Sequence, residues 1–427
     1  MEISAGMEKV MQRLMGTEFY VYGGAVRDMI AGQAPSKCRI AVRLPFTALQ
    51  KRFAGAAFIR GSVRTTIAEV DCRIIPLSGS IHGICARADF TVNAMAYSTV
   101  GGLIDNYGGA ADVKNKVIRV KEGGEDFLRE NPESMLRTVR CAAELGYTIA
   151  EETAELIKRC AVFTKYADRR MLMSEMTKLL LSPNPDYFRI LHELGVMRYV
   201  LPELDRCFGE EQRNKYHIYD VGEHIMAAVR NTPKDYILRW AALLHDIGKP
   251  MCSSTDQNGI IHFYGHHRES RAMADDILHR YGMRRESIRE ILILIENHDV
   301  RVDASAVHVK KMMAKTGAEL FDKLMQLQAA DNMAKNPKLF PEKYKRISAA
   351  RNMGALIAQS GEPYCMAQLA VNAKDLMKLG FKPGRDTTDA LRIMLDEVIR
   401  DSEKNRRDYL INRAREIKRA AAAAGKE

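Results

Sequence analysis

Histidine and aspartate recur through the second half of this 427-residue chain in a pattern that predicts a metal site. They stand in five separated segments: "DVGEHIM", "LLHDIGKP", "FYGHHRES", "LIENHDV" and "LQAADNM". Each segment lies in or beside an apolar stretch with helical spacing, and burying such groups is costly unless a metal or a polar partner satisfies them. Imidazole and carboxylate ligands together suit Mn, Fe, Co, Ni or Mg, among which the sequence does not choose. The candidate residues are His224, His245, Asp246, His266, His298 and Asp331.

Two cations accompany these segments. Lys249 in "HDIGKP" and Arg268 in "GHHRES" are candidates to take up negative charge that develops on a phosphoryl oxygen. For Arg268, a surface position at a helix end is the simpler explanation. His267 is expected to face solvent beside His266. Five further histidines are expected to be ordinary polar or interfacial residues: His82, His217, His262, His279 and His308.

A second set of residues, near the N-terminus, is suited to phosphate. Gly23-Gly24 and Arg27 precede the stretch "SKCRIAV", which places Lys37 and Arg39 on alternate residues of a predicted strand and therefore on one face. Two-metal nucleotidyl transfer needs carboxylates on such a face to hold its ions. A cation about 4 Å from a divalent ion is repelled by roughly 8 kcal/mol at an effective dielectric of about 20. The face is therefore expected to bind phosphate instead of metal.

Two kinds of element must position these groups. Residues 1 to about 120 contain short β-like runs ("EFYVYGG", "CRIAV", "EVDCRIIPL", "GLIDNY", "KVIRV") mixed with helical stretches, which predicts a small α/β domain. From about 124 onward the pattern is almost entirely helical, with Gly146 predicted to end one helix. The turn at Asp256–Gly259, followed by "IIHFYG", predicts a hairpin or irregular loop within the helical part.

Composition restricts the class of protein. The 46% hydrophobic and 28% charged content is typical of a soluble globular chain, and the length suggests two to four domains. No apolar run approaches the ~20 residues that cross a bilayer, and the N-terminal stretch lacks the features of a secretory signal. Eight scattered cysteines without a C-x-x-C pair predict reduced thiols and a cytoplasmic location. The net charge of +11 favours a polyanionic partner such as RNA, although a basic surface that only aids solubility explains it nearly as well.

Five stretches in chain order resemble the CCA-adding tRNA nucleotidyltransferase and poly(A) polymerase family, in its bacterial branch: "GGAVRDMIAG", "RADFTVNAMAY", "LIDNYGG", "PESMLRTVRCAAELGY" and "LMKLGFKPG". The family's strand pattern D-x-D-I-A-T aligns without a gap onto residues 37–42. The resemblance thus implies that Lys37 and Arg39 replace both metal-binding aspartates. A third family carboxylate would fall at Asp71, with Glu69 as the other candidate.

The same resemblance implies further contacts to nucleotide and RNA. In the family's E-D-x-x-R motif the acid that contacts the incoming base is here Ser134, while Arg137 and Arg140 remain. The element linked to ribose and triphosphate is mostly present in "RADFTVN", although a capped helix start explains its residues equally well. We therefore expect ATP or CTP to bind without turnover. The expected phosphate-binding set is Gly23, Gly24, Arg27, Lys37, Arg39, Arg87, Asp89, Asn93, Arg137 and Arg140.

The ordered histidine and aspartate segments resemble the HD superfamily of metal-dependent phosphohydrolases. That resemblance implies one metal at His224, His245, Asp246 and Asp331, with His266 and His298 completing an adjacent site. His245, Asp246 and Lys249 would be the catalytic residues. Nucleotidyltransferases with this module are associated with activity toward 2′,3′-cyclic and 2′-phosphates.

The sequence thus predicts an α/β head and then an all-α region, mostly α overall. The expected domains are a nucleotidyltransferase-like head (1–122), a helical neck binding RNA and nucleotide (123–208), an HD domain (209–345) and a helical tail contacting tRNA (346–427). The favoured function is a phosphohydrolase acting on an RNA 3′ end or a small nucleotide phosphoester, on a scaffold that no longer transfers nucleotides. The alternatives are an active tRNA nucleotidyltransferase or poly(A) polymerase, and a non-catalytic tRNA-binding regulator. Oligomeric state is not predicted.

Overall fold

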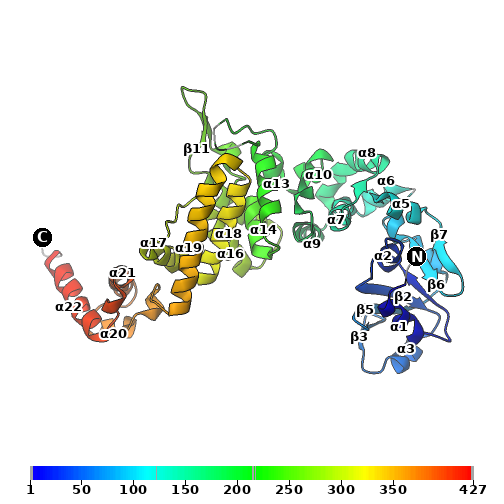
Figure 1. The fold of residues 1–427 in the computed structure, drawn as a ribbon, viewed down its shortest axis with the longest axis horizontal. Helices are drawn as coiled ribbons and strands as arrows, with labels where there is room; N and C mark the ends of the chain where they lie inside the picture. Colours follow the sequence, from blue (N-terminus) through cyan, green and yellow to red (C-terminus); the bar gives the residue numbers. More distant parts are fainter. Residues whose placement is uncertain (1–2, 122, 214–215, 217, 425–427) are drawn as a thin grey trace. The chain divides into compact units, whose positions relative to one another are not determined.

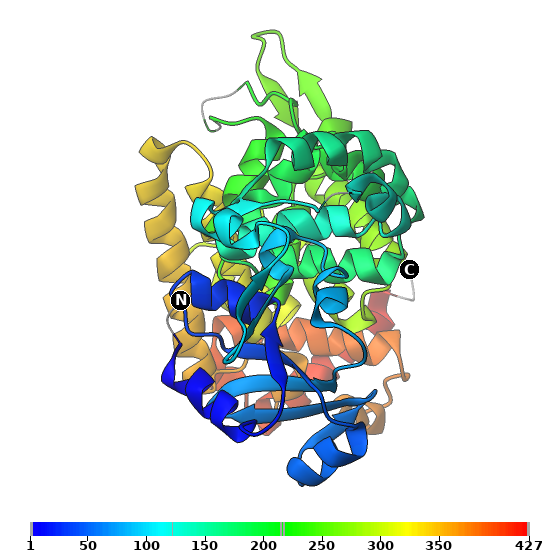
Figure 2. The same ribbon diagram turned by 90° about the vertical axis from the view of Figure 1, so that its right-hand side faces the viewer.

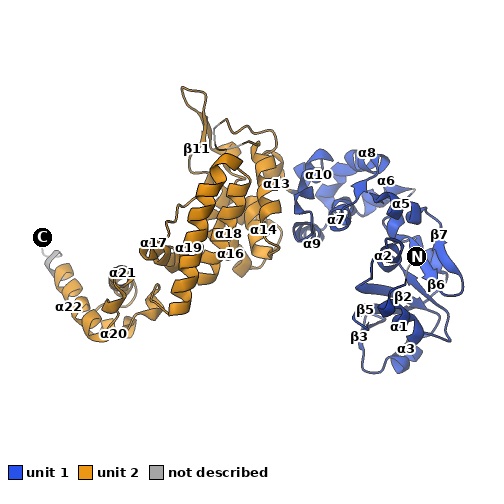
Figure 3. Ribbon diagram, in the orientation of Figure 1, with its two compact units in different colours: residues 1–200 blue, residues 201–427 orange. Residues whose placement is uncertain are grey.

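The computed structural model describes the chain except residues 1–2, 122, 214–215, 217 and 425–427 (Figure 1). The chain forms two compact units, residues 1–200 and residues 201–427, which are described separately (Figure 3). Among the described residues, none of the helices combines the length and the hydropathy that a bilayer-spanning segment needs. All eight cysteines are free thiols, as their spacing predicts.

A seven-stranded sheet forms the centre of the first unit, in the order β3-β4-β5-β2-β1-β6-β7. Figure 2 shows strands of this sheet in blue. Strands β2 and β5 run parallel, and the other neighbouring strands pair antiparallel. The strands are β1 (Phe19–Tyr22), β2 (Lys37–Val42), β3 (Ala57–Ile59), β4 (Ser62–Ile67), β5 (Val70–Pro76), β6 (Met95–Ser98) and β7 (Gly102–Asp105).

One face of this sheet packs in the main core of the unit, and the other carries charged residues together with a smaller apolar cluster. Ile40 and Ile74 are fully buried, and they pack with Met29 of a helix that covers the same face. Lys37 and Arg39 alternate with the buried residues of β2 and are exposed. The period of two in the strand pattern therefore positions both cations as the sequence predicts.

The helices of the first unit cover the sheet and then continue without it. As predicted, Gly146 ends a helix, α7 (Ser134–Leu145). Its φ is 65°, a value that glycine adopts without steric cost. A short parallel pair, β8 (Val117–Ile118) and β9 (Thr148–Ile149), lies beside the same helix. The helices are α1 (Ala5–Arg13), α2 (Gly24–Ile30), α3 (Phe46–Arg52), α4 (Ile81–Cys85), α5 (Gly109–Asn115), α6 (Gly124–Glu130), α7 (Ser134–Leu145), α8 (Glu151–Cys160), α9 (Arg169–Leu180), α10 (Phe188–Glu193) and α11 (Met197–Val200).

The second unit is almost entirely helical. Its central helix carries the sequence "YILRWAALL", and Trp240 in it is fully buried. The turn predicted at Asp256–Gly259 joins an antiparallel hairpin, β10 (Ser253–Thr255) and β11 (Ile261–Phe263). The helices are α12 (Pro202–Asp205), α13 (Val221–Asn231), α14 (Tyr236–Leu244), α15 (His266–Arg280), α16 (Arg285–Asn297), α17 (Ala306–Thr316), α18 (Ala318–Met333), α19 (Phe340–Ser360), α20 (Ala373–Lys378), α21 (Arg385–Arg400) and α22 (Arg407–Ala424). The predicted order of an α/β head followed by a helical region is confirmed.

Candidate metal centre

Four side chains from three helices meet inside the second unit. His224 lies on α13, His245 and Asp246 follow α14, and Asp331 lies near the end of α18. The Nε2 atom of His224 is 3.0 Å from Oδ1 of Asp331 and 3.2 Å from Oδ2 of Asp246. The Nε2 atom of His245 is 3.1 Å from Oδ2 of Asp246. All four residues are buried, and one potential ligand atom from each lies within 4.8 Å of the others.

A second group shares Asp246 with the first. His266 begins α15 and His298 follows α16. Their Nε2 atoms lie 3.2 Å and 3.4 Å from Oδ1 of Asp246, and 3.4 Å from each other. Asp246 therefore presents one carboxylate oxygen to each group, which is the arrangement of a bridging ligand. The structure brings together all six residues predicted from the sequence.

Backbone carbonyls fix the orientation of the imidazole rings. The Nδ1 atoms of His245, His266 and His298 lie 2.7 to 2.8 Å from carbonyl oxygens of nearby residues. Because a carbonyl oxygen only accepts hydrogen bonds, each Nδ1 carries the proton and donates. In the neutral ring that a metal would bind, the lone pair is then on Nε2, the atom that points into the cluster.

A close helix contact brings the two groups together. A Cβ added to Gly248 would lie 2.5 Å from the backbone nitrogen of Ser270, so only glycine fits between the end of α14 and the first turns of α15. The Gly248 N–H also donates to Oγ of Ser270 at 2.9 Å. This approach places His266 beside Asp246.

The donor set fits divalent ions. Nε2 of His245 and one oxygen each of Asp246 and Asp331 are buried without a hydrogen-bond partner among the described residues. Buried polar atoms of this kind are rare unless an ion or water satisfies them. Nitrogen and oxygen ligands suit Mn, Fe, Co, Ni or Mg, and two groups sharing a carboxylate suit a pair of ions.

Two lysines keep the carboxylates ionised. Nζ of Lys249 is 2.7 Å from Oδ2 of Asp246, and Nζ of Lys335 is 2.6 Å from Oδ2 of Asp331. Burial by itself would raise the pKa of both aspartates. The charge of His245 and Lys249 nevertheless holds the pKa of Asp246 well below its ordinary value, and Lys335 does the same for the pKa of Asp331. Both carboxylates are therefore charged and able to hold a cation.

Sequence analysis missed three residues of this centre. Asp299 lies 3.0 Å from Nε2 of His266 through its Oδ2. Gln212 accepts from Nζ of the buried Lys249 at 2.7 Å. The pair "HD" at 298–299 repeats the pair at 245–246 and pointed to Asp299, and Lys335 stands one helical turn after Asp331. Arg268, by contrast, is exposed.

In the first unit, the cationic strand lies where the sequence predicts, beside the predicted carboxylate. Lys37 of β2 is the register partner of Asp71 on β5, and all of Lys37, Arg39 and Asp71 are exposed. Glu69 lies instead in the β4–β5 turn, where it and Ala68 both have positive φ. Among the described residues, only the two groups in the second unit bring three or more potential ligands within 4.8 Å, so Asp71 stands without partners of that kind.

Four more residues of the predicted phosphate-binding set lie at the start of α2 or contact it. Gly23, with φ of 74°, links β1 to α2, which begins at Gly24, and the guanidinium of Arg27 donates to Oδ1 of Asn93 at 3.0 Å. Arg87 is exposed.

Arg137 and Arg140 on α7 are held by carboxylates. Arg137 forms an ion pair with Asp89, and Arg140 donates to Glu175 at 2.5 Å. Ser134 is fully buried at the start of α7. A phosphate would have to compete with these carboxylates, and the nucleotide-binding role of this set stays a prediction.

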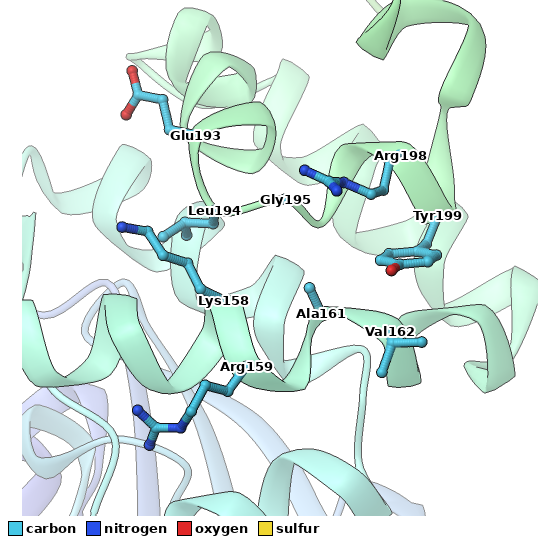
Figure 4. Close-up of a pocket in the computed structure, with 9 residues that line it drawn as sticks. All are labelled: Lys158, Arg159, Ala161, Val162, Glu193, Leu194, Gly195, Arg198 and Tyr199. Carbon is cyan, nitrogen blue, oxygen red and sulfur yellow. The ribbon is translucent and has the colours of Figure 1, made fainter.

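A cavity of about 350 Å³ lies elsewhere in the first unit, between α8 and the segment that joins α10 to α11 (Figure 4). Figure 4 shows Lys158, Arg198 and Tyr199 on its rim. The sequence analysis did not identify it.

Comparisons with known proteins place these features in a family. Residues 79–119 match a family model described as the poly A polymerase head domain, residues 146–208 match the probable RNA and SrmB-binding site of polymerase A, and residues 215–336 match the HD domain. An A-adding tRNA nucleotidyltransferase from Deinococcus radiodurans is 30% identical, with 88% of this chain and 90% of that protein covered. A CC-adding tRNA nucleotidyltransferase from Thermus thermophilus is 28% identical over 73% and 75% of the two chains.

The fold is that of solved tRNA-processing enzymes. The CCA-adding enzyme of Bacillus stearothermophilus in complex with CTP matches with a TM-score of 0.72 and 19% identity, over 99% of this chain and 100% of that one. The chain belongs to the tRNA nucleotidyltransferase and poly(A) polymerase family, and it carries an HD domain. The resemblance found in the sequence is confirmed.

Proposed function

We propose that this protein is a metal-dependent phosphohydrolase whose catalytic centre is the cluster of six histidines and aspartates in the second unit. The observation that carries the proposal is the pair of ligand groups joined by Asp246, with oriented histidines and ionised carboxylates. When bound, divalent ions in such a centre polarise a phosphoryl oxygen and make a water nucleophile available near neutral pH.

The residues around the ligands support this chemistry. Lys249 is buried between Asp246 and Gln212, so its ammonium group is fixed at the edge of the cluster, where it can offset charge on a phosphoryl oxygen. Lys335 fixes Asp331 in the same way. His245 and Asp246 reach the reacting atoms through the ions they hold, and Lys249 is the candidate for direct contact with substrate.

The substrate class we propose is a phosphoester at an RNA 3′ end or on a small nucleotide, of the 2′,3′-cyclic or 2′-phosphate type. Membership of a family whose relatives are named for tRNA supports RNA as the partner, as does a solved relative, the Thermotoga maritima CCA-adding enzyme, described in complex with tRNA. The net charge of +11 is favourable for such a ligand.

We further propose that the head no longer transfers nucleotides, because cations occupy the strand positions that would hold its metal ions. Lys37 and Arg39 share the exposed face of β2, and one carboxylate on that face, Asp71, is too little to hold two ions against them. ATP or CTP would then be bound without turnover.

A second candidate is active nucleotidyl transfer to tRNA, and the comparisons favour it. Two relatives whose match with this chain extends over most of their own length are named A-adding and CC-adding tRNA nucleotidyltransferases. Transfer would require metal binding by Asp71 and a further acid in spite of the neighbouring cations. A third candidate, a tRNA-binding regulator without catalysis, requires both centres to be inert.

Two assays on one preparation separate these candidates. The first follows phosphate release from RNA ending in a 2′,3′-cyclic phosphate or a 2′-phosphate, across Mn, Fe, Co, Ni and Mg. The second follows CTP and ATP incorporation into tRNA that lacks its 3′ end. We expect hydrolysis that disappears in His245→Ala and persists in His279→Ala, a matched change of an exposed histidine on α15. Incorporation without hydrolysis would establish the second candidate, and neither activity would support the third.

A further inference from the structure

Three arginines stand side by side across the sheet of the first unit. Arg39 of β2 is the register partner of Arg73 on β5, and Arg73 is the register partner of Arg64 on β4. Register partners in neighbouring strands project from the same face, and the strands lie about 4.8 Å apart. All three arginines are exposed, and we call them the arginine row. Lys37 stands on the same face, two residues before Arg39.

The arginine row differs from Arg27 and Arg137 in having no ion-pair partner, although the exposed Asp71 stands on the same face, opposite Lys37. Within the part of the chain that the structure describes, no carboxylate lies within ion-pair distance of Arg39, Arg64 or Arg73. Arg27 and Arg137, in contrast, each have an aspartate partner. Like charges directly opposite one another destabilise a sheet, so the row carries an energetic cost that a bound anion would relieve.

A partly buried tyrosine lies at one end of the arginine row and is affected by the charges of several arginines. Tyr22 on β1 is the register partner of Arg39, at the end of the row. Burial raises the pKa of the Tyr22 hydroxyl, while the charges of Arg39, Arg73 and Arg87 act on it in the opposite direction. Arg87, from outside the sheet, is therefore close enough to contribute to the same region.

We propose that the arginine row is a binding site for a polyphosphate chain held without a divalent ion. A guanidinium group binds phosphate oxygens through two parallel hydrogen bonds. Three arginines on neighbouring strands can therefore bind successive phosphates of one chain. The same cations repel Mg²⁺, so the ligand binds as the free anion. The family resemblance assigns contact with the base to position 134 and Arg137; here position 134 is a serine and Arg137 is paired with Asp89, so we expect the site to distinguish phosphates and not bases.

The chemistry fits a nucleoside triphosphate and an inorganic polyphosphate equally. Binding here rests on the proposal that the head holds ATP or CTP without turnover, and it does not depend on hydrolysis in the second unit. It reverses the ion requirement of a nucleotidyl-transfer site, since Mg²⁺ should here weaken binding.

Titration calorimetry on the full chain tests this, with tripolyphosphate, ATP and CTP as ligands, in EDTA and in excess Mg²⁺. EDTA also removes ions from the second unit, so failure of the proposed hydrolysis cannot affect the result. We expect all three ligands to bind in EDTA, ATP and CTP within a few-fold of each other, and Mg²⁺ to weaken binding about tenfold. If both nucleotides bind more tightly than tripolyphosphate, the natural ligand is a nucleotide. If all three bind equally, the natural ligand is an inorganic polyphosphate.

Variants locate the site. Arg73→Gln and, independently, Arg64→Gln should each weaken tripolyphosphate binding about tenfold, the loss expected for one charge-assisted contact. The matched control is Arg43→Gln, just beyond β2, whose arginine is exposed but paired with Glu18 at 2.8 Å. Three results would overturn the proposal: binding that requires Mg²⁺, equal losses in Arg43→Gln and the row variants, or tRNA that displaces tripolyphosphate from the row and binds it more tightly.

Discussion

The two charged regions of this protein differ in the sign of their charge and in their burial. In the second unit, aspartates and histidines are buried, and two lysines form ion pairs with the carboxylates. In the first unit, cations cover an exposed strand face and only Asp71 stands among them. We therefore expect the first arrangement to attract divalent cations and the second to attract anions. If so, the sign of two or three side chains, and not family membership alone, determines which chemistry this scaffold supports.

Removing the shared ligand should have the largest effect. Asp246→Asn replaces a carboxylate that both ligand groups use, so hydrolysis should fall by more than about 100-fold, beyond the loss seen when only a supporting residue is removed. Metal content measured on the purified variant should fall with it. His279→Ala is the control, and a variant that keeps both metal and activity would contradict the assignment.

Reversing the charge on β2 should have the next largest effect. In the double variant Lys37→Asp with Arg39→Asp, tripolyphosphate binding in EDTA should fall about 100-fold, because two charge-assisted contacts are lost. The variant should also gain binding of Mn²⁺ at the head, since two carboxylates then join Asp71. Calorimetry with each ligand measures both changes. Unchanged affinities would show that this face binds neither ligand.

The lysine and aspartate that support the ligands should have a smaller effect. Lys335→Met leaves Asp331 without its cationic partner, and Asp299→Asn removes the carboxylate next to His266. Each change should reduce metal affinity about 10- to 100-fold, the usual cost of losing a partner of a ligand. Competition with a chelator of known affinity measures this. Affinities within twofold of the original would mean that these residues do not support the ligands.

The smallest effect is one of stability. Without a ligand, Arg73→Gln removes repulsion between neighbouring arginines, so the free energy of unfolding of the head should rise by about 0.2 to 1 kcal/mol. Salt screens exposed charges, and the gain should shrink at high ionic strength. Thermal unfolding at low and high salt tests this, with Arg43→Gln as the control. A loss of stability would show that Arg73 makes favourable contacts instead.

The sequence was sufficient to predict the cluster of histidines and aspartates, because these candidate ligands stand in separate apolar helical segments. His224, His245 and Asp331 could be recognised without knowing how the helices pack. The contact of Asp299 with His266 arises from the packing of α15 with α16, which no single segment reveals. Lys335 pairs with Asp331 four residues earlier, so its signal lay within one segment and was overlooked.

For the head, the strands with strong β patterns were predicted, but β3, β4 and β6 were not. The arginine row could not be predicted, since it depends on the register of β4 with β5 and on the parallel pairing of β2 with β5. Local alternation placed Lys37 and Arg39 on one face. It could not say that Arg64 and Arg73 lie beside them.

The central claim, that divalent ions bind in the second unit and not on the strand face of the head, is tested most directly by anomalous diffraction from crystals of the full chain grown with Mn²⁺ and a nucleoside triphosphate. The account predicts anomalous peaks beside Asp246, between the histidines of the two ligand groups, and no peak near Lys37 and Arg39. A manganese peak at Asp71 with none at Asp246 would contradict it.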